Sequence, residues 1–462
     1  MLVTCVFDRE LHCRRAASAA FQEHVGRQGR AAFPHGIALL TRADYVNVAN
    51  RRHAFLVVSP FVASFPEYRD ALLDHLVTKK LSHWDASIRE LAARAIGRIV
   101  VSAPDMHQGG GVCDAVASQH NALLRRLLRL ALPTLSSSSL ADPSVEVMAR
   151  HGATLAIAEM TLALLNVPAF IDGDLQRDVK SLPIEMDKRR LFRGRGGEMI
   201  RCAVCRVVRV IALAEMALSV AAVKKLLAFL EECLVHAVPS VRDAAVDAFA
   251  GFASRYATVM TARGSAAARQ IWHEVVPRFL RRGVLTEQGI QNPNVAARRG
   301  YLRALGVAPR VLFQLHADTS DGSTLRDVVH TMLRAAALPL HATGDEPDAE
   351  SRVHAIHALV ALFSRMRCDG LDGLRGLEGD VVSTLVRCVH TDYGVDERGD
   401  VGSWVRKAAM RALERLLLET PPVGRAREVE LVGRRVENAL WHRFHRWRAV
   451  NESGRDRIAI RR

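Results

Sequence analysis

The stretch Ile88-Arg89-Glu90-Leu91-Ala92-Ala93-Arg94-Ala95 carries the pattern that decides the fold: an apolar residue, an arginine, two further residues and an alanine. An Asp, Asn or Ser stands a few residues upstream. Clear copies of this pattern occur at Arg14, Arg150, Arg242, Arg352 and Arg406, and weaker ones at Arg201 and Arg298. Successive copies lie 41 to 75 residues apart, and HEAT-type helix pairs repeat at about 40–47 residues. The sequence therefore predicts stacked helix pairs with lengthened loops.

Each residue of the pattern has a role in helix packing. The upstream Asp, Ser or Asn is suited to cap the second helix of a pair. The alanines let neighbouring helices approach, and Leu, Val and Ile at i, i+3, i+4 and i+7 bury the seam between them. We expect the arginine to lie along the layer edge, with its stem packed and its guanidinium bonded to a carboxylate or carbonyl. Since no pair can bury its apolar face alone, we predict an all-α, HEAT/armadillo-type solenoid.

The composition agrees with this fold class. The 462 residues are 49% hydrophobic, 24% charged and only 5% aromatic, which is low for a β-sandwich or barrel. The longest stretch without Asp, Glu, Lys or Arg is the 14 residues from His53 to Pro66, shorter than the roughly 20 that a membrane-spanning helix needs. The N-terminus shows no secretory leader, and the eight cysteines are scattered. We therefore expect a soluble protein of a reducing compartment.

The charge balance favours an acidic partner. The chain has 64 Lys and Arg against 49 Asp and Glu, a net charge of +15, and only seven of the 64 are lysine. Two regions concentrate the excess: residues 421–462, with eleven Arg against five acids, and residues 185–209, with eight bases against three acids. Such patches accelerate association with acidic proteins, nucleic acid or anionic lipid. A coding bias toward Arg is an alternative explanation for the high arginine content.

The 75-residue gap between Arg14 and Arg89 predicts an additional helix pair. Thr41 and Asp44 have the spacing of a capping box, which would open a helix that carries Tyr45, Val48, Phe55, Leu56 and Val58 toward the core. Pro66 is placed to begin a second helix.

Gly-, Ser- or acid-rich stretches predict loops at residues 108–111, 136–139, 193–197 and 343–348.

The motifs of the common enzyme classes are absent from the sequence. Lys180-Ser181 lacks the preceding glycine of a P-loop, and His273-Glu274-Val275-Val276-Pro277 has proline where a zincin needs its second histidine. The Arg193–Gly197 segment is too short for a dinucleotide turn. We interpret Cys202 and Cys205 as packed thiols on one helix, and His354/His357 as a helix-surface pair. We therefore predict no catalytic residue, no cofactor and no metal site.

The basic C-terminal region leaves three interpretations open. Trp441, Phe444 and Trp447 interleave with arginines and histidines and fall near one face of a helix. Core packing of a final helix is the first interpretation, a partner-binding face is the second, and nucleic-acid binding by stacking and phosphate contact is the third.

Two long stretches go beyond a generic repeat. The first runs from Cys13 to Gly29 and continues through Phe33-Pro34-His35-Gly36-Ile37 and Ser82-His83-Trp84-Asp85 into the Arg89 helix. The second runs from Asp392 to Met410. Both resemble the tubulin-folding cofactor D family, and the stretches at 150–152 and 300–306 are similar to it as well. Glu397 departs from the small hydroxyl residue that the resemblance implies at that position.

The resemblance implies a domain organisation in which residues 1–420 form one continuous solenoid. Residues 299–420 resemble the C-terminal region of the family, whose members are much longer than this chain, and residues 421–462 form a basic C-terminal helix or tail. It also implies a non-catalytic chaperone that binds β-tubulin and takes part in assembling and dismantling the αβ-tubulin heterodimer.

The same resemblance implies further partners and a place in the cell. The partners are cofactors E and C and an ADP-ribosylation-factor-like small GTPase. Tubulin's GTP hydrolysis is expected to be stimulated through partners, and the location to be the cytoplasm and the microtubule cytoskeleton. A generic HEAT scaffold, and less favourably a nucleic-acid binder through the Arg-rich tail, are the alternatives.

Two loop-to-helix corners are our candidates for partner contact. One is formed by His83, Trp84 and Asp85, directly before the Arg89 helix. The other contains Arg398, Asp400, Trp404 and Arg406, and we expect Asp400 to cap the helix that carries the last two. Each corner is alternatively only a joint between repeats.

Overall fold

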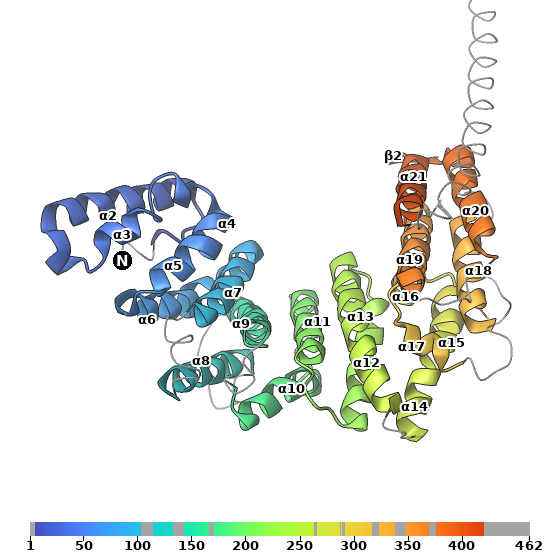
Figure 1. The fold of residues 1–462 in the computed structure, drawn as a ribbon, viewed down its shortest axis with the longest axis horizontal. Coiled ribbons are helices and arrows are strands. Elements are labelled where there is room, and N and C mark those ends of the chain that lie inside the picture. Colours follow the sequence, from blue (N-terminus) through green and yellow to red (C-terminus); the bar gives the residue numbers. More distant parts are fainter. Residues whose placement is uncertain are drawn as a thin grey trace, which may run out of the picture. The chain divides into compact units, whose positions relative to one another are not determined.

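The structure is a computed structural model that describes residues 5–102, 114–132, 143–165, 171–262, 266–286, 288, 292–316, 323–337, 348–368 and 376–419. Regular structure in these ranges is almost entirely helical, and the chain divides into two compact units, residues 1–229 and 230–462 (Figure 1). The boundary falls inside α12 (Val220–Leu234). The predicted all-α class is confirmed.

Unit 1 is a two-layered stack of helices. Its elements are α2 (Leu11–Ala32), α3 (Gly36–Leu40), η1 (Asn47–Ala49), α4 (Arg51–His53), η2 (Ala54–Val58), α5 (Ser59–Ala63), α6 (Pro66–His75), η3 (Leu76–Lys80), α7 (Ala86–Val101), α8 (Asp114–Ala131), α9 (Pro143–Ala163), α10 (Gly173–Lys188) and α11 (Gly197–Leu213). Helices α7, α9 and α11 pack side by side in one layer, with α8 and α10 against them in the other. Helix α9 is enclosed on several sides, so every residue from Arg150 to Ala158 is buried.

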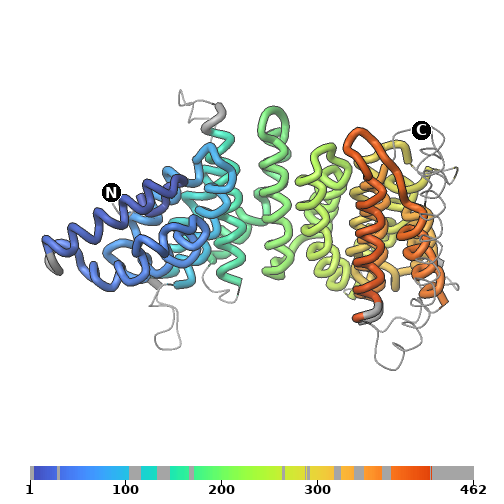
Figure 2. The backbone as a smooth tube through the Cα atoms, turned by 90° about the horizontal axis from the view of Figure 1, so that it is seen from above, coloured from blue at the N-terminus to red at the C-terminus, as the bar shows by residue number. Residues whose placement is uncertain are grey.

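Unit 2 repeats this arrangement. Its elements after α12 are α13 (Pro239–Ala262), α14 (Ala266–His273), α15 (Val275–Phe279), η6 (Leu280–Val284), α16 (Val295–Gly306), α17 (Arg310–Gln314), α18 (Ser323–Ala337), α19 (Ala349–Cys368), α20 (Glu378–Thr391), β1 (Val395–Asp396), β2 (Gly399–Asp400) and α21 (Gly402–Glu419). Helices α13, α16, α19 and α21 follow one another in one layer, and α18 and α20 lie in the second. Figure 2 shows successive helices of each unit running side by side in chain order. Strands β1 and β2 form an antiparallel hairpin that pairs Val395 with Asp400.

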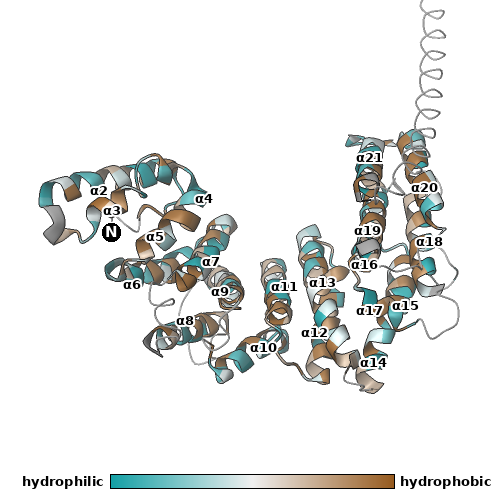
Figure 3. Ribbon diagram, in the orientation of Figure 1, coloured by the Kyte–Doolittle hydropathy of each residue, from teal (hydrophilic) through white to brown (hydrophobic). Residues whose placement is uncertain are grey.

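The helices are amphipathic, and this explains the layers. In Figure 3 apolar residues gather where helices pack against one another, and hydrophilic residues face outward. Seven of the eight pattern arginines fall on one layer of their unit; the eighth, Arg14, lies on α2. In unit 1 the seven lie on α7, α9 and α11, and in unit 2 on α13, α16, α19 and α21. For these seven arginines the prediction that the arginine marks the second helix of a pair is confirmed.

Two glycines at equivalent positions show that the repeats share one register. Gly152 and Gly300 each stand two residues after the pattern arginine. A Cβ on Gly152 would lie 2.0 Å from the carbonyl oxygen of Leu81, and one on Gly300 would lie 1.8 Å from that of Leu234. Leu81 and Leu234 each end the first helix of the preceding pair. Only glycine permits this close approach of helix to helix end.

The additional helices between Arg14 and Arg89 exist, but the predicted capping box at Thr41 is wrong. The Thr41 hydroxyl donates back to the Ala38 carbonyl, and the Asp44 carboxylate accepts from the amides of Val46 and Asn47 at the short helix η1. The helix that follows begins at Arg51, where Asn50 accepts from the His53 amide at 3.1 Å. Tyr45 therefore precedes the helix and is half exposed, at 50%.

Of the remaining predictions, some are confirmed and others are not tested by the described residues. Pro66 occupies the first turn of α6 as predicted. No helix of the described ranges is both long and apolar enough to span a bilayer. One continuous solenoid over residues 1–420 stays a prediction, since each unit is a stack by itself. The basic region 421–462, with its aromatic–arginine pattern, and the predicted loops at 108–111, 136–139 and 343–347 lie outside the described residues.

Candidate partner-binding site

The pattern arginines bind the loop that precedes their own helix. In Arg14, Arg89, Arg242 and Arg298, Nη1 donates to the carbonyl six residues earlier, at 2.6 to 2.9 Å; the acceptors are Asp8, His83, His236 and Asn292. In the first three, Nη1 also donates to the carbonyl five residues earlier. We call this arrangement the arginine clasp. The predicted position of the arginine, with a packed stem and a bonded guanidinium, is confirmed.

The second half of the clasp is not evident from the sequence pattern. The side chain six residues before the arginine accepts a hydrogen bond from the backbone amide two residues later, at 2.8 to 3.1 Å, in all four cases; the acceptors are again Asp8, His83, His236 and Asn292. Asp, His and Asn share a side-chain acceptor at the same distance from the backbone, and that shared chemistry was the available signal. The clasp therefore fixes both ends of the turn into the helix.

Three pattern arginines make other contacts. Arg150 pairs with Glu146 on its own helix, and the guanidinium of Arg201 lies 5.1 Å from the ring centre of Phe192. Arg352 donates from Nε to the Ala336 carbonyl at 3.0 Å. The motif thus specifies a buried or packed arginine, and the local loop decides its acceptor.

The first predicted corner is a clasp with an exposed tryptophan. Asp85 caps α7 by accepting from the Ser87 amide at 2.9 Å, and Arg9 Nε donates to its other oxygen at 3.0 Å. Burial opposes ionisation of Asp85, but the hydrogen bonds from Ser87 and Arg9 lower its pKa on balance. His83 stacks on Trp84, with ring centres 5.5 Å apart, and Arg9 covers the Trp84 ring at 4.5 Å. Trp84 is nevertheless 62% exposed.

A buried histidine supports this corner from the next helix pair. Arg89 Nε donates to His151 Nδ1 of α9 at 3.0 Å, and Arg89 Nη2 contacts the Met199 sulfur of α11 at 3.3 Å. Burial, with Arg89 and Arg206 nearby, lowers the pKa of His151 to about 3. His151 therefore stays neutral and accepts, which ties α7, α9 and α11 together below the corner.

The second predicted corner is built on the β-hairpin. As expected, Asp400 caps α21, accepting from the Ser403 amide at 2.9 Å. Arg406 pairs with Asp400 at 2.5 Å and donates to the backbone carbonyl of Asp392. The Arg406 guanidinium lowers the pKa of Asp400. These contacts close the hairpin onto the start of α21.

Arginine–aromatic pairs face solvent at this corner too. Arg398 pairs with Asp396 at 2.6 Å and with Glu350 of α19 at 3.0 Å, and its guanidinium lies 5.1 Å from the Trp404 ring centre. Arg406 covers Tyr393 at 4.7 Å. Trp404 is 37% exposed. The structure brings together the residues of each predicted corner within its own unit.

Both corners combine a paired carboxylate with an exposed aromatic ring. The carboxylates of Asp85 and Asp400 are engaged by helix amides and guanidinium groups. The exposed part of each corner is an aromatic ring held beside an arginine, a combination common in protein interfaces. Among the described residues, no three or more His, Cys, Asp or Glu side chains are placed to hold a metal ion. Cys202 and Cys205 lie on α11 as predicted, with Cys205 buried.

Comparison with known proteins finds several partial matches. Residues 1–37 match the model of the tubulin-specific chaperone D-like ARM repeats. Tubulin-specific chaperone D of Dictyostelium discoideum is 31% identical over 221 residues, and tubulin-folding cofactor D of Schizosaccharomyces pombe is 34% identical over 104 residues. Over these stretches the chain is similar to tubulin-specific chaperone D.

The match to chaperone D is partial. The aligned stretches cover 47% and 22% of this chain, and 13% and 9% of the Dictyostelium and fission yeast proteins. The chain thus corresponds to a small part of those relatives. Among solved structures, importin beta is similar with a TM-score of 0.38 and 12% identity, over 89% of this chain and 52% of that one. The HEAT/armadillo class predicted from the arginine pattern agrees with these ARM repeats and with the stacked helices.

Proposed function

We propose that this chain is the tubulin-binding part of a tubulin-folding chaperone. It binds β-tubulin and takes part in assembling and dismantling the αβ-tubulin heterodimer, without catalysing a reaction of its own. The observation that carries the proposal is the 31% identity over 221 residues to tubulin-specific chaperone D.

The geometry of the repeats supports a binding role. Stacked helix pairs present long rows of loops and helix faces, on which a large protein partner is held by many weak contacts. The two corners add rigid aromatic anchors, because clasps and caps fix the backbone beneath Trp84 and Trp404 before a partner arrives. Such preorganisation reduces the entropy lost on binding.

The finer parts of the proposal concern partners and place. We propose that cofactors E and C and an ADP-ribosylation-factor-like small GTPase act together with this chain. In that scheme GTP is hydrolysed by tubulin, and the chain contributes by holding it. The proposed location is the cytoplasm and the microtubule cytoskeleton, which imaging of the tagged chain in living cells tests.

Purified full-length chain mixed with αβ-tubulin tests the central claim. Size-exclusion chromatography and immunoblotting should show β-tubulin co-eluting with the chain, with weaker association as salt rises from 50 to 300 mM because basic patches contribute. An importin-type HEAT protein of similar charge is the control. Equal retention of tubulin by that control, or no co-elution at low salt, would favour a generic HEAT scaffold instead.

A further inference from the structure

The loop between α10 and α11 carries a dense, exposed positive charge. Within the eight residues 188–195 five side chains are basic and exposed: Lys188, Arg189, Arg190, Arg193 and Arg195. We call residues 188–196 the basic loop. The acidic residues beside it are Glu185, which pairs with Lys188 at 2.5 Å, Asp187 and Glu198. Five bases against three acids leave this segment with a net positive charge.

The backbone of the basic loop is held in a defined conformation. Arg190 has φ +58°, and Gly194 and Gly196 have φ +83°. The Leu191 amide donates to the Met186 carbonyl at 3.0 Å and the Arg190 amide to that of Asp187 at 2.8 Å, so α10 ends in a Schellman-type turn. Glycine or asparagine is usual at the left-handed position, and an arginine there costs conformational energy. The chain thus keeps an arginine where glycine would be more stable.

An aromatic anchor keeps the loop from folding back. Phe192, in the middle of the basic loop, is buried against Phe229 of α12, with ring centres 5.1 Å apart. The guanidinium of Arg201 from α11 covers the same ring at 5.1 Å. With Phe192 fixed inside, the arginines on either side of it must point to solvent.

Three of these arginines have no internal partner. Arg190, Arg193 and Arg195 make no side-chain hydrogen bond or ion pair with any residue that the structure describes. Lys225 of α12 adds charge from the neighbouring helix, since it lies close enough to lower the pKa of Glu185 along with Lys188 and Arg189. Like charges fixed this close repel one another, and a carboxylate-rich partner relieves that repulsion.

We propose that the basic loop is a docking site for an acidic, Asp- and Glu-rich segment of another polypeptide. Arginine guanidinium groups bind carboxylates through paired hydrogen bonds, and three partnerless guanidiniums on a fixed loop can engage several carboxylates at once. The inference goes beyond the proposed function, in which basic patches contribute only generally, because it names this loop and its ligand; its test contains no tubulin, so either proposal can fail without the other.

The surroundings favour a peptide over nucleic acid or lipid. Binding of single-stranded nucleic acid relies on aromatic faces for base stacking, and the loop's one aromatic ring, Phe192, is buried and already covered by Arg201. Polybasic clusters also attract anionic lipid, but stable binding to a membrane surface adds buried apolar side chains or a lipid chain to the charges. The two large apolar side chains of residues 188–196 offer little for this, because Leu191 is half-buried and Phe192 is buried.

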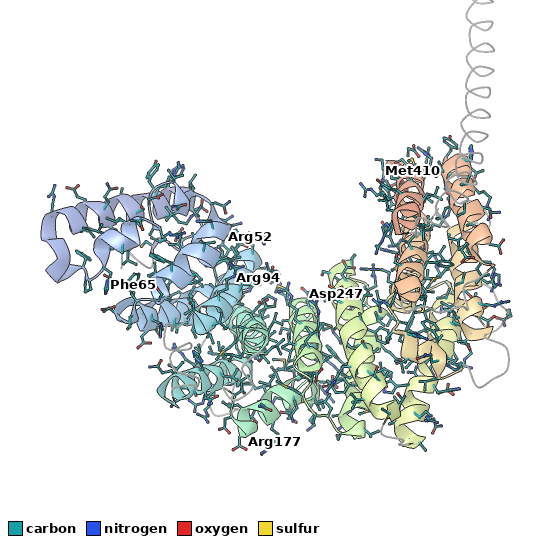
Figure 4. All side chains as sticks on the ribbon, viewed as in Figure 1. Arg52, Phe65, Arg94, Arg177, Asp247 and Met410 are labelled. Carbon is teal, nitrogen blue, oxygen red and sulfur yellow. The ribbon has the colours of Figure 1, made fainter. Side chains whose placement is uncertain are left out.

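A charge-matched pair of triple variants tests the proposal. Arg190→Gln, Arg193→Gln and Arg195→Gln remove the three partnerless charges of the loop. Arg27→Gln, Arg52→Gln and Arg177→Gln remove three exposed charges elsewhere in unit 1; Figure 4 shows Arg52 on α4 and Arg177 on α10. Both triples lower the net charge by three, and circular dichroism checks that each full-length chain is folded.

Fluorescence anisotropy with a fluorescein-labelled decaglutamate peptide gives the readout. The loop triple should weaken binding about tenfold or more, as expected when three exposed ion pairs are lost, and the control triple less than twofold. Equal binding by the loop triple and the unaltered chain would overturn the proposal. So would equal losses in both triples, or a loop-dependent affinity for a 20-nucleotide single-stranded RNA that exceeds the affinity for the peptide.

Discussion

Arg352 of α19 and Asp392 after α20 form an ion pair with two hydrogen bonds, and their side chains are only 8% and 1% exposed. The backbone carbonyl of Asp392 accepts from Arg406 of α21. Asp392 thereby connects three successive helices of unit 2. Burial raises the pKa of Asp392 and the Arg352 guanidinium opposes that rise. The second predicted corner rests on this pair, because the hairpin begins immediately after it.

Asp392→Ala should therefore destabilise unit 2 strongly. Removal of one partner leaves the Arg352 charge buried without its counter-ion, which typically costs about 3–5 kcal/mol. The double variant Arg352→Met/Asp392→Leu removes both charges and should cost clearly less. Urea unfolding followed by circular dichroism, with limited proteolysis around α19–α21, measures both. A double variant as unstable as the single one would show that packing dominates there.

Gly300→Ala and Gly152→Ala should both destabilise the fold by separating neighbouring repeats. An added Cβ at either position overlaps a backbone carbonyl oxygen, which cannot move without shifting a helix. Overpacking of this kind costs about 1–3 kcal/mol or more. Gly26→Ala is the matched control: Gly26 lies in α2 with nothing within 4 Å of its Cβ position, so alanine should stabilise by up to about 1 kcal/mol. Thermal melting curves of the three variants provide the comparison.

The arginine clasp requires a guanidinium. In the unaltered chain, Arg242 Nη1 donates to the carbonyl oxygens of His236 and Ala237, both at 2.7 Å. A lysine at this position keeps the charge but reaches only one of these two oxygens. Arg242→Lys should cost about 1–3 kcal/mol, the usual price of a buried carbonyl left without a donor. Arg52→Lys, at an exposed position, should change stability by less than about 0.5 kcal/mol. Equal effects of the two substitutions in a melting experiment would contradict the role of the clasp.

The sequence alone predicts which helices carry the pattern arginines. It also predicts that each arginine has a packed stem and a hydrogen-bonded guanidinium. Arg89 and Arg242 were placed correctly because the pattern combines a helix period with a fixed upstream cap. The partner in the loop was missed, since His83 and Asn292 look unrelated until the backbone shows the shared acceptor position. Tyr45 was misplaced because Thr41 and Asp44 have capping-box spacing, while Asn50 caps the actual helix.

The solvent exposure of the corner tryptophans could not be predicted from the sequence, for a different reason. Trp84 and Trp272 are both tryptophans in helical surroundings, yet one is 62% exposed and the other 0%. Only the tertiary contacts decide between them: Arg9, distant in sequence, covers Trp84 from one side. The role of His151 as an acceptor for Arg89 depends likewise on two helices that the sequence alone does not bring together.

Stability should fall as the pH drops below neutrality. Burial lowers the pKa of four histidines, to about 4 for His75, His120 and His354 and about 3 for His151. In the unfolded chain their pKa is about 6.5, so the unfolded state binds more protons between pH 6.5 and about 4, and the free energy of unfolding decreases over that window. Each of these histidines can cost on the order of 1–2 kcal/mol at pH 5.

The variant His151→Gln separates this effect from general acid denaturation. Glutamine retains an acceptor for Arg89 and does not titrate, so the variant should lose less stability than the unaltered chain between pH 7.5 and pH 5. Melting temperatures measured across that range give the answer. Parallel pH profiles for the two proteins would mean that His151 is not protonated on unfolding in that window.

Trp84 and Trp404 are predicted to act as anchors for the tubulin partner, over and above their place at repeat joints. Trp84→Ala and Trp404→Ala remove rings that are already partly exposed, so each should change stability by less than about 1 kcal/mol. If the rings contact β-tubulin, each change should weaken its binding about tenfold, the loss typical of a buried tryptophan at an interface.

Leu213→Ala and Met410→Ala, at exposed apolar positions outside the corners, are the controls (Figure 4 shows Met410 on α21). Biolayer interferometry with immobilised tubulin measures the affinities. Tryptophan variants that bind as tightly as the controls would leave the corners as joints between repeats and place the tubulin contact on another face.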